Sequence, residues 1–61
     1  MTITIFEGYT TDYILLGSTD ERFHRAFGNI VRTAYHNLYA TMKDITEWAK
    51  SLDEEVQFVI D

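Results

Sequence analysis

Apolar residues between Phe23 and Leu52 recur mostly every three or four positions. This spacing places their side chains on one face of an α-helix. Because the pattern extends over about half of the chain, it decides the expected architecture. The residues that share the face are Phe23, Ala26, Phe27, Ile30, Val31, Ala34, Leu38, Ile45, Ala49 and Leu52.

Two helical arrangements fit this pattern. One is a continuous helix over residues 19–52, roughly 50 Å long at ~1.5 Å per residue, which only an oligomer would support. The other, which we favour, has a break near residues 38–42, with Thr41 capping a second, short helix. Gly28 and Asn29 fall on the polar side of the first helix, and we do not expect them to end it.

Three segments have the pattern of β-strands. Residues 2–6 alternate threonine and isoleucine before a final phenylalanine, which is typical of a half-buried strand. Residues 9–16 are rich in β-forming side chains and read as the return strand of a hairpin, with Gly8 in the turn. Residues 56–60 form a short β-run, which we expect beside one of the hairpin strands.

The register of the hairpin is open between two alternatives. A two-residue turn would pair Ile3 with Asp12, which places a carboxylate opposite a core residue. A four-residue loop over residues 7–10 would pair Ile3 with Ile14, which suits a buried face better.

Ser18 and Glu21 have the spacing of a capping box, so the first helix is expected to begin near residue 19. Combined with the strands, this predicts an α+β domain of ββααβ order. The N-terminal hairpin and the C-terminal strand form a sheet, and two helices pack on one of its faces. We expect residues 1–61 to form a single compact domain.

Composition changes the picture in two ways. A chain of 61 residues buries only about 60% of its unfolded surface, and without cysteine it has no disulfide to stabilise it. Its content of 46% hydrophobic and 15% aromatic residues therefore points to dense packing or self-association. The N-terminus lacks the pattern of a signal peptide, and no stretch approaches a transmembrane span. We expect a cytoplasmic protein without a membrane association.

The charge is acidic and uneven. The net charge of −5 divides into −1 for residues 1–40 and −4 for residues 41–61. The C-terminal third is therefore the acidic pole, and it argues against general binding to nucleic acid.

Residues suited to catalysis or metal binding are few. His24 and His36 lie 12 positions apart and lack the spacing of a helical metal site. Ser18 is explained by helix capping, and the three glycines are too scattered for a phosphate loop. We expect no enzymatic activity, no metal and no cofactor.

Charged residues form two rows at helical spacing. A row of basic and polar residues would lie opposite the apolar face and could contact phosphate or carboxylate. It consists of Arg22, Arg25, Asn29, Arg32 and His36. An acidic row on the second helix could imitate phosphates toward a basic partner, and it consists of Asp44, Glu47, Ser51 and Glu54, extended by Asp53 and Glu55.

The nine aromatic residues are too many for one small core. Tyrosine and tryptophan are common in interface hot spots. We expect Phe23, Phe27 and Phe58 in the core. We expect Tyr9, Tyr13 and Tyr39 at the rim or an interface, with Tyr9 and Tyr13 on one face of a strand.

These observations favour a non-enzymatic protein that binds another protein, one with a basic surface. In size, acidity and lack of catalytic groups the chain resembles the small accessory proteins with which phages block host enzymes, a similarity of type that involves no specific residue. The most specific form of the protein-binding hypothesis is inhibition of a nucleic-acid-processing enzyme. The alternatives are a nucleic-acid-binding regulator that uses Arg22, Arg25 and Arg32, and a structural assembly subunit.

Self-association is also expected, because a chain this short cannot cover both its sheet and its helices. Each 100 Å² of apolar surface removed from water contributes about 2.5 kcal/mol before entropic costs. The candidate contacts of a homodimer are Tyr35, Leu38, Tyr39 and Met42.

Overall fold

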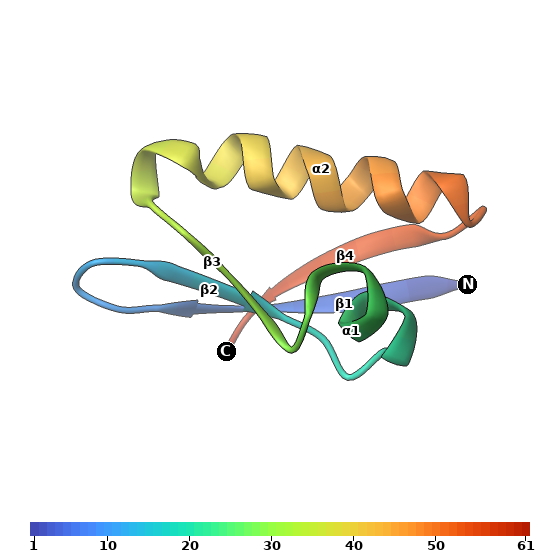
Figure 1. The fold of residues 1–61 in the computed structure, drawn as a ribbon, viewed down its shortest axis with the longest axis horizontal. Helices are drawn as coiled ribbons and strands as arrows, with labels where there is room; N and C mark the ends of the chain where they lie inside the picture. Colours follow the sequence, from blue (N-terminus) through green and yellow to red (C-terminus); the bar gives the residue numbers. More distant parts are fainter.

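A computed structural model describes all 61 residues of the chain. It contains one mixed sheet of four strands in the order β3-β2-β1-β4 and two α-helices. Figure 1 shows α2 lying along one side of the sheet, with the β1–β2 loop at one end and the N-terminus at the other. In chain order the elements are β1 (Thr2–Tyr9), β2 (Ile14–Gly17), α1 (Glu21–Phe27), β3 (Ile30–Thr33), a 3₁₀ turn η1 (Tyr35–Asn37), α2 (Leu38–Ser51) and β4 (Glu55–Ile60).

The strand pairing places β1 at the centre of the sheet. It pairs antiparallel with β2, which in turn pairs antiparallel with β3. On its other side β1 pairs in parallel with β4, from Thr2 opposite Glu55 to Glu7 opposite Ile60. The predicted place of the C-terminal strand, beside a hairpin strand, is therefore confirmed.

The core lies between the sheet and the helices. Alternation along β1 turns Ile3 and Ile5 toward the helices, and both are almost completely buried. Phe23 of α1 meets this layer and packs edge-on against Trp48 of α2, with 5.9 Å between the ring centroids. The seven residues of the buried cluster are Ile3, Ile5, Ile14, Leu16, Phe23, Ile45 and Ala49.

The fold class is confirmed as a small α+β domain with two helices and a mixed sheet. The element order differs from the predicted one, because a strand lies between the two helices. Residues 30–33 form β3 at the edge of the sheet. Ile30 and Val31 satisfied the helical spacing, but both are β-branched and suit a strand better.

The break between the helices is at Gly28 and not near residues 38–42. The amide of Gly28 donates to the carbonyl of His24 and closes α1, while its φ of 87° turns the chain away. Glycine adopts this conformation without the steric cost that a Cβ imposes. The continuous helix over residues 19–52 is therefore wrong.

The hairpin register also differs from both alternatives. Tyr9 pairs with Ile14 and Phe6 with Gly17, so the four-residue loop covers residues 10–13 instead of 7–10. The hydroxyl of Thr10 accepts a hydrogen bond from the amide of Tyr13 and donates one to its carbonyl, both at 2.8 Å. This local bonding by a threonine side chain supports the later turn.

The helix starts are set by residues other than the predicted caps. The N-cap of α1 is Asp20, whose side chain accepts from the amide of Arg22, while Ser18 accepts from the amide of Asp20. The second helix begins at Leu38, so Thr41 lies inside it. The Thr41 hydroxyl bonds to the hydroxyl of Thr33 on β3 at 2.8 Å and joins α2 to the sheet.

Replacing Gly28 with alanine is expected to lower stability by about 1–3 kcal/mol, because alanine is strained at this φ. For a chain of this size that corresponds to a drop in Tm of roughly 4–8 °C per kcal/mol, measurable by circular dichroism. The control is Asn29→Ala, at an exposed neighbour without positive φ. Equal Tm values for the two variants would contradict the assignment of Gly28 as the helix stop.

Candidate protein-interaction surfaces

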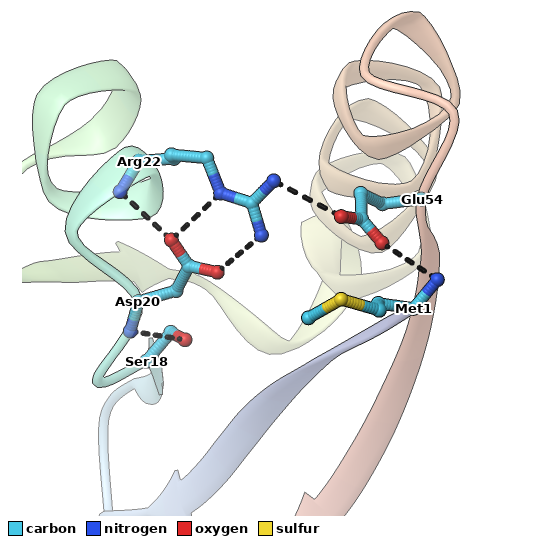
Figure 2. Close-up of polar contacts among 5 residues, drawn as sticks. All are labelled: Met1, Ser18, Asp20, Arg22 and Glu54. Carbon is cyan, nitrogen blue, oxygen red and sulfur yellow. Dashed lines mark hydrogen bonds and ion pairs between the residues drawn. The ribbon is translucent and has the colours of Figure 1, made fainter.

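An ion-pair network joins three segments that are far apart in the sequence (Figure 2). The guanidinium of Arg22 lies 2.7 Å from Asp20 Oδ2 and 3.0 Å from Glu54 Oε1. The other oxygen of Glu54 faces the ammonium of Met1 at 3.1 Å. The start of α1, the turn after α2 and the start of β1 are therefore held together at one end of the molecule.

The network shifts the pKa values of its members. Hydrogen bonds from the side chain and amide of Arg22 lower the pKa of Asp20 from 3.8 to about 2. Hydrogen bonds from Arg22 and the Met1 ammonium also lower the pKa of Glu54 below its usual 4.5. Both carboxylates therefore stay charged in the folded protein well into the acidic range.

Glu54 is consequently not part of an outward acidic row. The helix ends at Ser51, and Asp53 takes a φ of 56°, which turns the chain back toward the sheet. Aspartate tolerates this left-handed conformation better than most residues. The turn brings the Glu54 side chain, only 11% exposed, against Arg22 and Met1.

The other predicted acidic residues are exposed. Asp44 and Glu47 lie on α2, and Asp53 and Glu55 flank the turn that follows it. None of these four carboxylates belongs to the protein's three ion pairs. We call Asp44, Glu47, Asp53 and Glu55 the acidic surface.

The three arginines do not share one face. Arg22 is held by two carboxylates, and Arg25 is exposed on α1. Arg32 lies on β3, where its guanidinium carbon is 5.1 Å from the centre of the Tyr13 ring. The predicted row also loses Asn29 and His36, since α1 ends at Phe27.

Two tyrosines meet near the hairpin end of the sheet. The rings of Tyr9 and Tyr35 have centroids 6.4 Å apart. The hydroxyl of Tyr9 donates to the buried carboxylate of Glu7 at 2.9 Å, and this bond raises the pKa of Tyr9. The hydroxyl of Tyr35 donates to the carbonyl of Thr10. Both rings remain about half exposed, but their hydroxyl groups are engaged inside the protein.

The remaining tyrosines are exposed on separate surfaces. Tyr13 precedes Ile14, which faces the core, so alternation turns Tyr13 to the opposite face from Tyr9. The prediction that Tyr9 and Tyr13 share a strand face is therefore wrong. The predicted exposure of Tyr9, Tyr13 and Tyr39 is confirmed, and Tyr39 on α2 is the most accessible, at 89%.

The predictions for the apolar residues are confirmed for the core and wrong for part of the homodimer contact. Phe23 is fully buried, and Phe27 and Phe58 pack against the core. Leu38 and Met42, which we expected in a homodimer contact, also pack against the protein's own core. Of the four predicted dimer contacts, only Tyr35 and Tyr39 are exposed.

A groove of about 340 Å³ runs between α2 and the edge strand β4. Phe58 forms part of its strand wall, and Tyr39 and Met42 lie on its helix wall. Lys43 and Lys50, the only lysines of the chain, also line it, together with Glu47, which lies between them in the sequence. The cationic side chains of α2 therefore stand toward β4.

Sequence reasoning missed one further surface, the face of the sheet directed away from the core. It carries Phe6, Leu15, Ile30 and Val59, of which Phe6 and Ile30 are 38% and 57% exposed. The signal was present in the β-branched residues at 30–31. It was hidden because their spacing also fitted a helix.

The structure offers few groups suited to chemistry. The ring of His24 hydrogen-bonds the carbonyl of Ser18, and His36 is exposed in η1. Nowhere do three or more histidine, aspartate or glutamate side chains gather closely enough to hold a metal ion. Neither helix has the length and apolar content needed to cross a membrane.

Arg22→Gln is expected to flatten the acid limb of the stability profile. Because the pKa values of Asp20 and Glu54 are lowered on folding, their contribution is complete above the unfolded values of 3.8 and 4.5. It is lost as the pH falls toward the folded value of about 2 for Asp20. The variant should have a lower Tm than the wild type at neutral pH, and the two should converge at about pH 2.

The measurement is Tm by circular dichroism from neutral pH to about pH 2. Arg25→Gln, which removes an exposed arginine outside the ion pairs, is the matched control and should parallel the wild type. A profile for Arg22→Gln that runs parallel to the wild type would show that the network does not set the acid limb.

Comparison with known proteins gives no relative: no family model, no curated protein and no solved structure matches the chain.

Proposed function

We propose that the protein acts, without catalysis, by binding another protein that presents a basic surface. The acidic surface carries this proposal. Its four carboxylates are exposed, and no cation of the chain neutralises them at ion-pair distance. Complementary charge of this kind speeds encounter and selects partners.

The position of the acidic surface supports the proposal. Asp44 and Glu47 are three residues apart on α2, so they project from neighbouring positions of one rigid helix. Asp53 and Glu55 extend the charge beyond the helix end. Tyr39 adds a large exposed aromatic ring near the start of the same helix, of the kind that anchors interfaces.

In its most specific form, the proposal is that the partner is a nucleic-acid-processing enzyme. The carboxylates of the acidic surface then imitate the phosphates that the basic surface of the enzyme binds. This would be inhibition of the phage type, acting in the cytoplasm. Duplex DNA added in excess should then displace the protein from its partner, because both occupy the same cationic surface. A complex that withstands DNA would contradict this form and leave the broader proposal standing.

Charge reversal on the acidic surface is expected to abolish binding. Asp44→Lys with Glu47→Lys should reduce retention of the partner by at least about tenfold in a pull-down from lysate. Asp12→Lys with Glu21→Lys changes the net charge equally at exposed acids elsewhere, and it should retain the partner. Binding should weaken between about 0.05 M and about 0.3 M salt, because exposed charges are screened.

Two results would count against the proposal. If both double variants retain the partner equally, the acidic surface is not the contact. If the wild-type protein retains no protein, binding to a protein partner is wrong.

The arginines are expected not to support binding to nucleic acid. Three phosphate contacts would make the logarithm of affinity fall with log salt at a slope near about −3. With Arg22 held by Asp20 and Glu54, we expect no gel shift of duplex or single-stranded DNA at about 0.05 M salt. A shift that disappears in Arg25→Gln with Arg32→Gln would instead establish the regulator.

A further inference from the structure

The face of the sheet directed away from the core is apolar and open. Strand alternation that buries Ile3 and Ile5 turns Phe6 to this outer face, together with residues of all four strands. A hollow of about 200 Å³ lies on it, with no lining residue from α1 or α2. The residues that line the hollow are Phe6, Gly8, Leu15, Gly17, Ile30 and Asp61.

The outer face has two rows in register across the strands. In the first row Phe6 of β1 lies between Val59 of β4 and Gly17 of β2, and Gly17 lies beside Ile30 of β3. From β3 to β4, this row therefore carries a large side chain (Ile30), no side chain (Gly17) and two further large side chains (Phe6 and Val59).

The second row is one step along the strands. Gly8 of β1 pairs with Leu15 of β2, which pairs with Arg32 of β3. Asp61 continues β4 at the level of Gly8, since its amide donates to the carbonyl of Glu7 at 2.9 Å. This row ends in a cation on the β3 edge and a carboxylate on the β4 edge.

We propose that this outer face binds a second copy of the chain, with the two sheets packed face to face about a two-fold axis. The axis runs parallel to the strands between β1 and β2. It therefore lays β2 of one copy over β1 of the other, and β3 over β4, at the same level along the strands. Aligned packing of two sheets in this way is a common arrangement.

Size complementarity follows from the two rows. In the first, Phe6 of each copy meets Gly17 of the other, and Ile30 meets Val59. In the second, Leu15 of each copy meets Gly8 of the other. Each large side chain that stands over the centre of the sheet thus meets a glycine, which leaves room for it.

Charge complementarity follows from the same operation. Arg32 of each copy is placed over Asp61 of the other, so the outer ends of the second row are oppositely charged. Two equivalent pairs form, because a two-fold contact repeats every interaction. Tyr13, whose ring Arg32 already covers, lies on the same face and would be enclosed further.

The area of the outer face limits the affinity of the proposed self-association. Four strands about 4.8 Å apart, paired over four residues at about 3.3 Å each, give a contact of roughly 14 Å by 13 Å. This is well below the roughly 800 Å² per partner of a standard stable interface, so weak association, with a Kd of about 100 µM, is expected. The contact lies on the sheet, away from Asp44 and Glu47 of α2, and does not depend on the proposed function. Of the acidic surface, only Glu55, beside Thr2 at the start of β4, faces the same side of the sheet.

The first test uses sedimentation velocity of the whole chain from about 5 µM to about 500 µM. The mass should rise from that of one chain toward that of two. Gly8→Val should hold it near one chain, because it fills the hollow that receives Leu15. An added Cβ at Gly8 has no neighbour closer than 4.0 Å within the chain, and φ there is not positive. The variant should therefore fold, and Ala40→Leu on the exposed side of α2 is the control that should associate normally.

The second test exchanges the charges. Arg32→Glu should weaken association by at least about tenfold, and adding Asp61→Arg should restore it. Circular dichroism confirms that each variant is folded. Wild-type protein that stays monomeric at about 500 µM leaves the face to another occupant and overturns the proposal. Association that survives Gly8→Val, or that the double exchange fails to restore, overturns it equally.

Salt separates this inference from the proposed function. Screening weakens the two Arg32–Asp61 pairs but also weakens the repulsion between two copies that each carry a net charge of −5, so self-association should change little with salt. Binding of a basic partner through the acidic surface should weaken under the same conditions. Self-association that collapses at high salt would therefore overturn the face-to-face contact, whatever the outcome of the partner test.

Discussion

The parallel pairing of β1 with β4 is the constraint on which the rest of the molecule depends. Parallel neighbours cannot be joined by a tight turn, so the chain must travel back across the sheet before β4 can form. The helix α2 makes this return and buries Ile45 and Ala49 on the sheet as it does so. Glu54 lies where the return ends, and its contacts with Met1 and Arg22 hold the first pair of the parallel ladder in place.

Patterns confined to one element were readable from the sequence. The alternation in residues 2–6 and the β-run at 56–60 gave two strands of the sheet, and the apolar spacing around Ile45 and Ala49 gave the second helix. The strand β3 was hidden because Ile30 and Val31 fit a period of 3.6 as well as a period of 2. The φ of Gly28 distinguishes a helix from a strand at these residues, and it is a property of the folded backbone that the spacing of apolar residues does not reveal.

The same distinction, between local patterns and contacts formed in the folded chain, applies to the candidate surfaces. Tyr39, Asp44 and Glu47 are exposed because they lie off the apolar side of α2, and helical spacing predicted this exposure correctly. The placement of Glu54 depends on its ion pairs with Met1 and Arg22, and that of Tyr9 on its contact with the ring of Tyr35 in η1. Contacts between elements decided these positions, so spacing along the chain could not supply them.

A two-layer domain of this length has helices for only one side of its sheet, and the other side must be made compatible with water or with a partner. Gly8 and Gly17 leave that side hollowed beside Phe6 and Leu15, a shape that fits large side chains arriving from outside. If a second copy fills the hollows, the two α2 helices lie on opposite outer sides of the pair. Asp44 and Glu47 of α2 are then presented twice, on sides that face away from the two-fold axis. Such a pair could hold two partner molecules at once, or bind a two-fold symmetric partner with the avidity of a bivalent ligand.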